Sequence, residues 1–225
     1  MAESSSLKVY GDYLSQPSRA VLCLCLLNNI PFKFVETRPM AGQHLTQDFK
    51  KINPLRKVPA IEEDGFTLGE STAILKYLCN SKNIPEHWYP NDPKKRALVD
   101  QYLDWHHSNT RKCNLYFIGV NAQFYPKDFI TWDPAQIKKE AYQAVKVIND
   151  VFLKDRKFIA SDDEMTIADL CALCELAQLH MTRFDFSKFP KVQEWMKRMF
   201  ENKVIQKVHV PLFKFKEKLV QHPRL

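Results

Sequence analysis

Hydrophobic and polar positions follow two different periods in the first part of the chain. Apolar and polar residues alternate over Leu7–Tyr10 and again over Phe32–Glu36, which predicts two strands. Between them, apolar residues recur at helical spacing over Pro17–Leu27, and proline suits the first turn of a helix. A strand, a helix and a second strand in this order predict a parallel βαβ unit.

A hairpin and a further helix are expected after this unit. Two short apolar segments within Val58–Leu68 flank Asp64-Gly65, and Asp-Gly is a strong signal for a tight hairpin turn. Glu70–Leu78 carries its apolar residues on one side and is predicted as a helix, whereas residues 37–57 show neither period and are interpreted as irregular. The pattern therefore predicts a small α/β domain of the thioredoxin type over residues 1–80.

The remainder of the chain is predicted to be helical. Residues 81–92 contain two prolines among mixed polar residues and are typical of a linker. Beyond them, Asp92-Pro93 and Asp133-Pro134 each place a capping residue before a proline at the first helical position. We therefore expect an all-helical domain over residues 93–225.

Apolar positions define the expected core of this second domain. A continuous buried stripe is predicted at Ile137, Ala141, Ala144, Val145, Ile148 and Phe152. Thr166 and Asp169 have the spacing of a capping box, and Ile167–Leu179 is apolar nearly all round, so this helix is predicted to lie at the centre. A helix opening at Pro190 is expected to bury Val192, Trp195, Met196 and Met199.

Composition and charge narrow the possible partners. The 225 residues are 45% hydrophobic and 26% charged, which is ordinary globular composition, and the formal net charge is +7. Lysines are spread along the polar faces of predicted helices, which favours a solvated surface over a nucleic-acid interface. No apolar run approaches the ~20 residues of a membrane helix, and MAESSS is not typical of a secretory signal. We expect a cytoplasmic protein that contacts neither membrane nor nucleic acid.

The six cysteines are interpreted as free thiols of a reducing compartment, most of them buried. Cys171 and Cys174 have CxxC spacing, but a single pair lacks the partners of a tetrahedral zinc site. A redox CxxC would stand at a helix N-terminus after a strand, whereas this pair falls inside an apolar run. Core packing is therefore favoured, and no metal site is expected.

Two stretches of the first domain place polar groups beside helix or strand ends. Ser15 precedes the first predicted helix, whose unpaired N–H groups and positive dipole end favour an anion such as a thiolate. Taken alone, Ser15 is better explained as a helix cap. In Lys57-Val58-Pro59, a proline at the start of a strand leaves its neighbour's backbone free to pair outside the sheet, and it is a candidate for a cis peptide bond.

Two further stretches have a functional and a plain structural interpretation. Glu70-Ser71 puts a carboxylate and a hydroxyl at the start of a helix, where they could bind a ligand or simply complement the dipole and cap the helix. His44 lies in the irregular segment, where a lone histidine is more often an ordinary surface residue than a ligand-binding group.

The order and spacing of these stretches resemble those of the glutathione transferases, and most closely of the theta class. The matching stretches are LSQPSRAV at 14–21, NNIPF at 28–32, GQHL at 42–45, FKKINPLRKVPAI at 49–61, FTLGESTAILKYL at 66–78, WYP at 88–90 and MTIADL at 165–170. The resemblance implies a homodimeric detoxification enzyme that conjugates the glutathione thiolate to hydrophobic, in particular halogenated, electrophiles. It also implies glutathione-dependent peroxide reduction, with glutathione as co-substrate and no separate cofactor.

The resemblance also implies a role for each candidate around the glutathione thiol. Ser15 matches the serine that donates a hydrogen bond to the sulfur and stabilises the thiolate, with Ser18 and Tyr10 as alternatives if Ser15 faces away. The backbone of Val58 matches the segment that pairs with the cysteinyl unit, held by a cis proline at Pro59.

Further positions match the two ends of glutathione. Glu70 matches the carboxylate that binds the γ-glutamyl ammonium, and Ser71 lies at the helix N-terminus that binds the α-carboxylate. His44 and Lys57 match positions near the glycyl carboxylate. Asp104 and Arg111 match the helix from which the partner subunit of the dimer approaches glutathione.

The chain departs from the family pattern at two places. Gly69 stands where relatives often carry a larger residue, so a looser turn before the following helix is expected. The sequence ends soon after Phe215, where mammalian theta enzymes continue into an extra helix, and this predicts a more open second-substrate pocket. The walls of that pocket are expected to include Trp105, His106, Phe117 and Phe124.

Two other classes of protein are alternatives to a transferase. A non-catalytic ligand carrier or interaction module could have the same fold, because fold alone does not determine function. The intact set of Ser15, Pro59, Glu70 and Ser71 argues against it. A disulfide oxidoreductase is disfavoured because the first helix offers serine where a redox enzyme needs cysteine.

Overall fold

A four-stranded mixed sheet forms the first part of the computed structural model, which describes residues 6–122, 130–182 and 184–221. The strands in spatial order are β2 (Lys33–Glu36), β1 (Lys8–Gly11), β3 (Ala60–Glu63) and β4 (Phe66–Gly69). β1 pairs in parallel with β2 and antiparallel with β3, and β4 pairs antiparallel with β3. This is the thioredoxin-like sheet that the sequence predicts.

The β3–β4 hairpin has the two-residue turn expected from Asp64-Gly65. Both residues have a left-handed backbone, with φ of 49° at Asp64 and 83° at Gly65, and Glu63 pairs with Phe66 across the turn. Two consecutive left-handed residues define the turn type whose twist matches that of the strands, and asparagine, aspartate and glycine adopt this conformation most readily.

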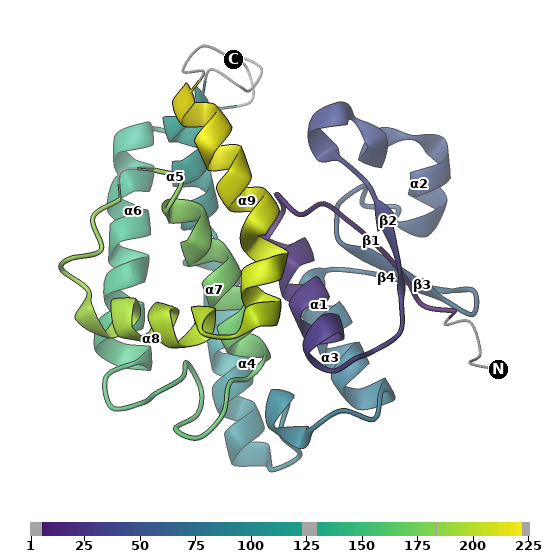
Figure 1. Cartoon of the computed structure of the whole chain (residues 1–225), viewed down its shortest axis with the longest axis horizontal. Coiled ribbons are helices and arrows are strands. Elements are labelled where there is room, and N and C mark those ends of the chain that lie inside the picture. Colours follow the sequence, from purple (N-terminus) through teal and green to yellow (C-terminus); the bar gives the residue numbers. More distant parts are fainter. Residues whose placement is uncertain (1–5, 123–129, 183, 222–225) are drawn as a thin grey trace.

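Helices cover both faces of the sheet. α1 (Gln16–Leu27) and α3 (Ser71–Ser81) lie between the sheet and the helical part of the molecule (Figure 1). The cross-strand neighbours Val9 and Ile61 are fully buried in the core that these helices share. Tyr10, next to Val9, points to the opposite face, where its ring centroid lies 6.1 Å from that of Phe49.

Phe49 belongs to α2 (Gln47–Ile52), a helix within the segment that was expected to be irregular. That expectation was wrong for these residues. The Thr46 hydroxyl accepts a hydrogen bond from the Phe49 backbone N–H at 3.2 Å and caps the helix. Six residues make fewer than two turns, which is too short for a helical period to be recognised. Short 3-10 turns precede it at Pro39–Ala41 and Gln43–Leu45.

The second part of the molecule is helical, as predicted. Its helices are α4 (Pro93–Ser108), α5 (Lys112–Val120), α6 (Pro134–Val147), α7 (Ile167–Leu179), α8 (Pro190–Phe200) and α9 (Lys203–Gln221). A 3-10 turn at Glu86–Trp88 precedes α4, and a π-helical turn at Ile148–Phe152 continues α6. Asp92 and Asp133 cap α4 and α6 through their carboxylates.

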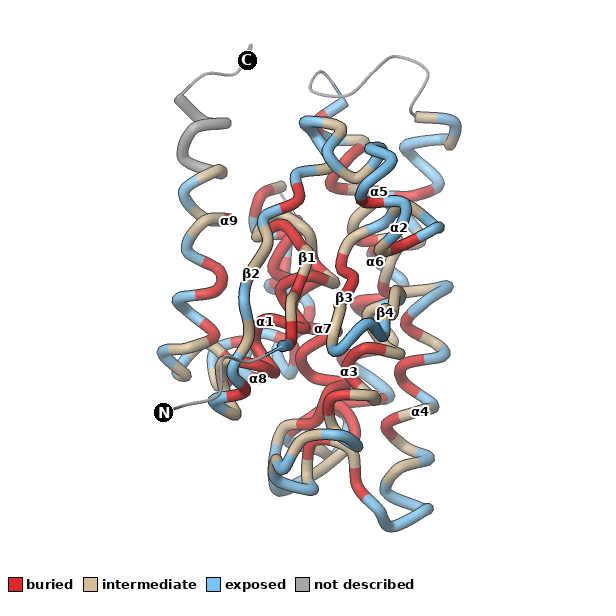
Figure 2. Tube along the Cα trace, turned by 90° about the vertical axis from the view of Figure 1, so that its right-hand side faces the viewer, coloured by how far each residue is buried: buried red, intermediate tan, exposed pale blue. Residues whose placement is uncertain are grey.

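α7 is the central helix, and every one of its residues is buried (Figure 2). The predicted capping box is present: Thr166 accepts from the Ala168 N–H at 3.2 Å, and Asp169 accepts from the Thr166 N–H at 2.8 Å. The other Asp169 oxygen accepts from the Ile159 N–H and the Trp195 indole N–H. Burial raises the pKa of Asp169, and these hydrogen bonds satisfy its carboxylate in the core.

The predicted inward positions of α6 and α8 are all buried. All six cysteines are free, and only Cys79 is half-buried rather than buried. Cys171 and Cys174 of α7 pack in the hydrophobic core, as expected. No helix among the described residues is both long and apolar enough to span a membrane.

Candidate active site

Two cavities lie where the sheet domain faces the helical domain. A polar cleft of about 300 Å³ lies between α1, the loop before β3, the start of α3 and helices α4, α5 and α7. An apolar cavity of about 680 Å³ lies beside it and extends to α9. The two share Gln16, Pro17, Lys57, Val58 and Arg111 as lining residues. They therefore form one hollow with a polar and an apolar end.

The structure brings most of the predicted site residues to this hollow. The polar cleft is lined by Lys57, Val58, Pro59, Glu70, Ser71 and Arg111. The apolar cavity is lined by Ser15 and His44 in addition to Lys57, Val58 and Arg111. Asp104 is exposed on α4 and lines neither cavity. Its contact with a partner subunit stays a prediction.

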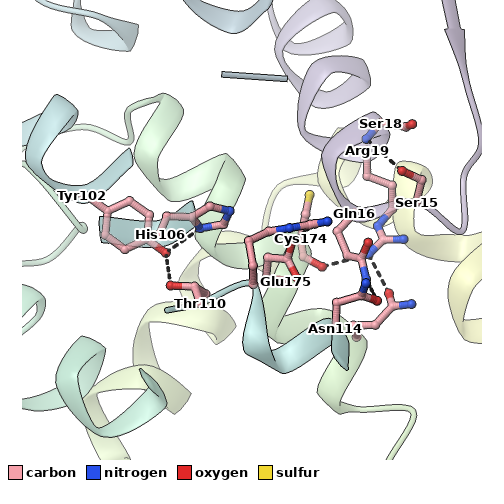
Figure 3. A network of polar contacts seen from close by, with 12 residues as sticks. Ser15, Gln16, Ser18, Arg19, Tyr102, His106, Thr110, Asn114, Cys174 and Glu175 are labelled. Atoms are coloured by element: carbon pink, nitrogen blue, oxygen red, sulfur yellow. Dashed lines mark hydrogen bonds and ion pairs between the residues drawn. The ribbon is translucent and has the colours of Figure 1, made fainter. Parts of the chain in front are cut away.

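Ser15 is the N-cap of α1, and this role leaves its hydroxyl proton available. Its Oγ accepts a hydrogen bond from the Ser18 backbone N–H at 3.4 Å (Figure 3). No described residue accepts a hydrogen bond from the Ser15 hydroxyl itself. A hydroxyl that accepts one hydrogen bond is a better donor of another. Capping the helix and donating to a ligand in the cavity are thus compatible functions of one side chain.

The alternative thiol partners face elsewhere. Ser18 is fully buried and its side chain points away from Gln16 and Glu175 (Figure 3). Tyr10 lies on the far face of the sheet, where its hydroxyl donates to Glu62 at 2.7 Å. Burial and this hydrogen bond raise the pKa of Tyr10 to about 12. Among the three hydroxyls, Ser15 alone lines the hollow.

The loop before β3 is held by an asparagine that sequence reasoning missed. The Asn53 amide donates to the Lys57 carbonyl at 2.8 Å, and its oxygen accepts from the Leu55 N–H at 3.1 Å. The Val58–Pro59 peptide bond is cis, as the resemblance implied. A Cβ at Gly69 would lie 2.9 Å from the Asn53 nitrogen. Gly69 therefore makes room for Asn53, which occupies the space that a larger side chain would take, and the looser turn stays a prediction.

Glu70 has an unusual backbone at the start of α3. Its φ is 62° and its ψ is 112°, in the region that favours glycine. Its side chain makes no capping hydrogen bond, so the carboxylate remains available at the polar cleft beside the first N–H groups of the helix. Sparsely populated backbone conformations concentrate at functional sites.

Arg111 lies at the junction of the two cavities and is paired with a buried carboxylate. Its guanidinium forms an ion pair with Glu175 of α7, which is only 1% exposed. The charge of Glu175 raises the pKa of Arg111. The second carboxylate oxygen of Glu175 has no hydrogen-bond partner among the described residues. Arg111 therefore lines this chain's own cleft from the N-cap of α5, and not from the first helix of the helical domain, where the resemblance placed it with Asp104.

Arg19 is a positioning residue that the sequence analysis did not single out. It is fully buried, and its guanidinium donates to the carbonyls of Tyr13 and Cys174 at 2.8 Å and to the Gln178 side chain at 3.0 Å. Burial lowers its pKa. These hydrogen bonds tie the segment before Ser15 to α7. The available signal was a charged residue within an otherwise apolar helix.

The polar cleft also contains a neutral imidazole. Burial lowers the pKa of His106 to about 3. Its Nδ1 lies 3.3 Å from the Tyr102 hydroxyl, which lies 3.2 Å from the Thr110 hydroxyl (Figure 3). His106 therefore contributes a polar but uncharged wall at neutral pH.

The apolar cavity differs in part from the expected second-substrate pocket. Phe117 lines it as predicted, whereas His106 lines the polar cleft instead. Trp105 lines neither cavity, because its ring packs against Phe152 at 5.0 Å. Phe124 lies outside the described residues. Leu212 and Phe215 of α9 were missed and also line the cavity.

At the other side of the hollow, His44 lies in the 3-10 turn before α2. Its Nδ1 is buried and has no hydrogen-bond partner among the described residues.

No group of three or more histidine, cysteine, aspartate or glutamate side chains in the described part of the chain is placed to hold a metal ion.

The chain belongs to the glutathione S-transferase family, as its sheet domain with a cis-proline loop facing a helical domain suggests. Residues 9–92 match the family model for the glutathione S-transferase N-terminal domain, and residues 124–203 match the C-terminal domain. Rat glutathione S-transferase theta-1 is 36% identical over 204 residues, which cover 86% of this chain and 82% of the rat protein. The chain is thus an enzyme of the transferase class, with theta-class relatives.

Solved theta-class structures have the same fold. A human theta-class enzyme in complex with the glutathione conjugate of 1-menaphthyl sulfate is 32% identical, with a TM-score of 0.86 over 97% of this chain and 91% of that chain. Human glutathione transferase theta-2, in complex with glutathione and an unknown ligand, is 32% identical, with a TM-score of 0.85 over 96% of this chain and 90% of that chain.

Proposed function

We propose that Ser15 activates the glutathione thiol in this transferase, and that the thiolate attacks a hydrophobic, in particular a halogenated, electrophile. The observation that carries the proposal is the free hydroxyl proton of Ser15 in the apolar cavity, next to Gln16, which lines both cavities. Glutathione would lie across the junction, with its sulfur at Ser15 and the electrophile against the apolar walls.

The polar cleft suits the γ-glutamyl end of glutathione. The Glu70 carboxylate would bind the ammonium group, and Ser71 with the first N–H groups of α3 would bind the α-carboxylate. The backbone of Val58, beside the cis Pro59, would pair with the cysteinyl unit. At the other end, Lys57 and the unpartnered Nδ1 of His44 would face the glycyl carboxylate.

The reaction needs little covalent work from the protein. The sulfur forms a bond to carbon while the carbon–halogen bond breaks and the halide leaves with the electron pair. Thiols titrate near ~8.5, so lowering the pKa by about two units requires roughly 2.7 kcal/mol of preferential thiolate stabilisation. A hydroxyl hydrogen bond to a charged group supplies ~1.5–3 kcal/mol, and a helix N-terminus adds to it.

Replacing Ser15 tests this function. In Ser15→Ala, the apparent pKa of the bound thiol should rise by about 1–2 units, and kcat/KM at neutral pH should fall roughly 10- to 100-fold. Glutathione should still bind, because the other contacts remain. The measurements are ultraviolet titration of the bound thiolate and initial rates with several alkyl and benzylic halides.

Ser18→Ala is the matched control, because Ser18 is a buried hydroxyl of the same helix that faces away from the hollow. It should keep the wild-type thiol pKa. A Ser15→Ala protein that bound glutathione normally and kept the full conjugation rate would refute the assignment.

The assembly and location of the enzyme belong to the same proposal. We infer a cytoplasmic homodimer, in which Asp104, exposed on α4, faces the glutathione of the partner subunit. Sedimentation equilibrium should give twice the monomer mass. Detoxification of electrophiles, and reduction of peroxides by the same thiolate, are the physiological roles that follow from this chemistry.

A further inference from the structure

Arg56 has an unusual backbone for an arginine and lines the apolar cavity. Its φ is 52°, in the left-handed region, and its backbone N–H donates to the Asn53 carbonyl at 2.9 Å. Four described residues other than glycine have positive φ, and two of them, Asn29 and Asp64, are of types that adopt it readily. The other two are Arg56 and Glu70, and each lines one end of the hollow.

The guanidinium of Arg56 has no partner in the described part of the chain, either by hydrogen bond or by ion pair. The remaining cations of the cavity are accounted for. Arg111 is paired with Glu175, and Lys57 faces the glycyl carboxylate in the proposed glutathione position. The acidic side chain of the cavity, Asp12, accepts a hydrogen bond from the Leu14 N–H at 2.9 Å. With glutathione in the proposed position, Arg56 is therefore the cation of the cavity that still has no anionic partner.

Apolar side chains surround this charge. Met40, Leu45 and Leu55 line the cavity and are 60%, 54% and 61% exposed. Large exposed apolar groups gathered at the mouth of a cavity are typical of a ligand-binding surface. Phe117 and Phe215 also line the cavity and extend its apolar wall. The volume of about 680 Å³ suits a ligand larger than a simple alkyl halide.

We propose that Arg56 is a specificity-determining residue for the second substrate, and that it binds an anionic group which an apolar electrophile carries away from its reacting carbon. A carboxylate is the simplest such group. This inference rests on the proposed function, since it takes the sulfur to be at Ser15 and the glycyl carboxylate at Lys57. The carboxylate takes no part in the chemistry: the carbon–sulfur bond forms, the carbon–halogen bond breaks, and the carboxylate stays in the conjugate.

The test compares a carboxylate with its methyl ester. The ligands are S-(4-carboxybenzyl)glutathione and its benzoate methyl ester, together with a second pair that has a longer biphenyl body. Their dissociation constants are measured by titration calorimetry on the wild type and on Arg56→Met. The wild type should prefer each acid, and Arg56→Met should reduce the ratio of ester to acid dissociation constants by about five- to tenfold in at least one pair.

Arg38→Met is the matched control, because Arg38 is an exposed arginine that pairs with Glu36 at 2.7 Å and lies outside the apolar cavity. It should leave the ratio at the wild-type value. Added salt should reduce the difference in affinity between the acid and the ester in the wild type, because salt screens the attraction between Arg56 and the carboxylate.

Three outcomes would overturn the inference: an unchanged ratio in both pairs, failure of every conjugate to bind, or a rise in the KM for glutathione in Arg56→Met with the ratio unchanged. A higher KM for glutathione with an unchanged ratio would indicate that Arg56 binds the glycyl carboxylate of glutathione. Initial rates with the corresponding benzylic chlorides separate this inference from the proposed function. Selective binding without conjugation would refute the role of Ser15 and leave the role of Arg56 intact.

Discussion

Gly69 shows how one missing side chain shapes the proposed glutathione site. The Asn53 amide occupies the space beside Gly69 and from there holds the carbonyl of Lys57, directly before the cis-proline loop. The consequence is a chain of contacts from β4 to the backbone that is proposed to pair with glutathione. A glycine here is required by the close approach of another side chain, because its own φ is not left-handed.

Gly69→Ala should therefore weaken glutathione binding as well as stability. The added methyl group would displace Asn53 and break its hydrogen bond to Lys57, at a cost of about 1–3 kcal/mol in unfolding free energy. The KM for glutathione should rise severalfold. Denaturant unfolding and initial rates measure the two effects.

A double-mutant cycle provides the control for this prediction. Asn53→Ala removes the side chain with which the new methyl group collides, so the double variant should be less unstable than the sum of the single variants predicts. Strict additivity would show that Gly69 and Asn53 act independently.

At the scale of whole elements, the packing of α1 against α7 positions Ser15. Arg19 crosses this interface and donates to two carbonyls and one side-chain amide in the core. A buried arginine with satisfied acceptors is costly to remove, because the acceptors then lose their partners in a place that water does not reach.

Arg19→Met should lower the free energy of unfolding by about 3 kcal/mol or more, and it should reduce activity by releasing the segment before Ser15. Arg19→Lys should lose less stability, since one ammonium group can still reach part of the acceptors. Arg38→Met, on the exposed surface, should cost at most about 1 kcal/mol. A loss in Arg19→Met no greater than that in Arg38→Met would contradict this account.

Local signals explain which elements could be predicted from the sequence. Helix starts and a hairpin turn depend on contacts between residues that are close in the sequence, so a sequence pattern reveals them directly. Examples are Asp92-Pro93, Asp64-Gly65 and Thr166. α2 was missed because it is shorter than two turns. The acceptors of Arg19 were missed because Cys174 lies on a different helix in the other half of the chain, and a periodic pattern contains no information on such a contact.

The candidate site was predictable to a similar extent. The order and spacing of its residues identified them, but the sequence did not predict how their side chains are arranged. Sequence reasoning set helix capping by Ser15 against a functional role, whereas in the structure Ser15 caps α1 and also lines the apolar cavity. It also placed Arg111 on the helix of Asp104 and missed its ion pair with Glu175, because no sequence signal links Arg111 to a carboxylate on α7.

For the whole molecule, His106 links stability to pH. Its folded-state pKa of about 3 lies below the ordinary 6.5 of the unfolded chain. Between these values the unfolded state binds more protons, so the stability that His106 contributes is fully present above pH 6.5 and is lost as the pH falls toward 3. The slope is about 1.4 kcal/mol per pH unit at most.

The comparison of wild type with His106→Asn isolates this effect. Asparagine places an oxygen near the position of Nδ1, so the contact with Tyr102 can persist while the titration is removed. The difference in unfolding free energy between the two proteins should change by about 1.9 kcal/mol between pH 7 and pH 5. Parallel stability curves would show that burial does not depress the pKa of His106.

The contribution of α9 to the apolar cavity has a consequence for how the enzyme is made. Every residue that lines the polar cleft lies at or before Glu175, whereas Leu212 and Phe215 complete the apolar cavity. A ribosome adds ~5–20 residues per second, so the residues proposed to bind glutathione in the polar cleft emerge seconds before the wall that α9 contributes. The wall of the proposed second-substrate pocket is therefore the last part of the site that translation completes.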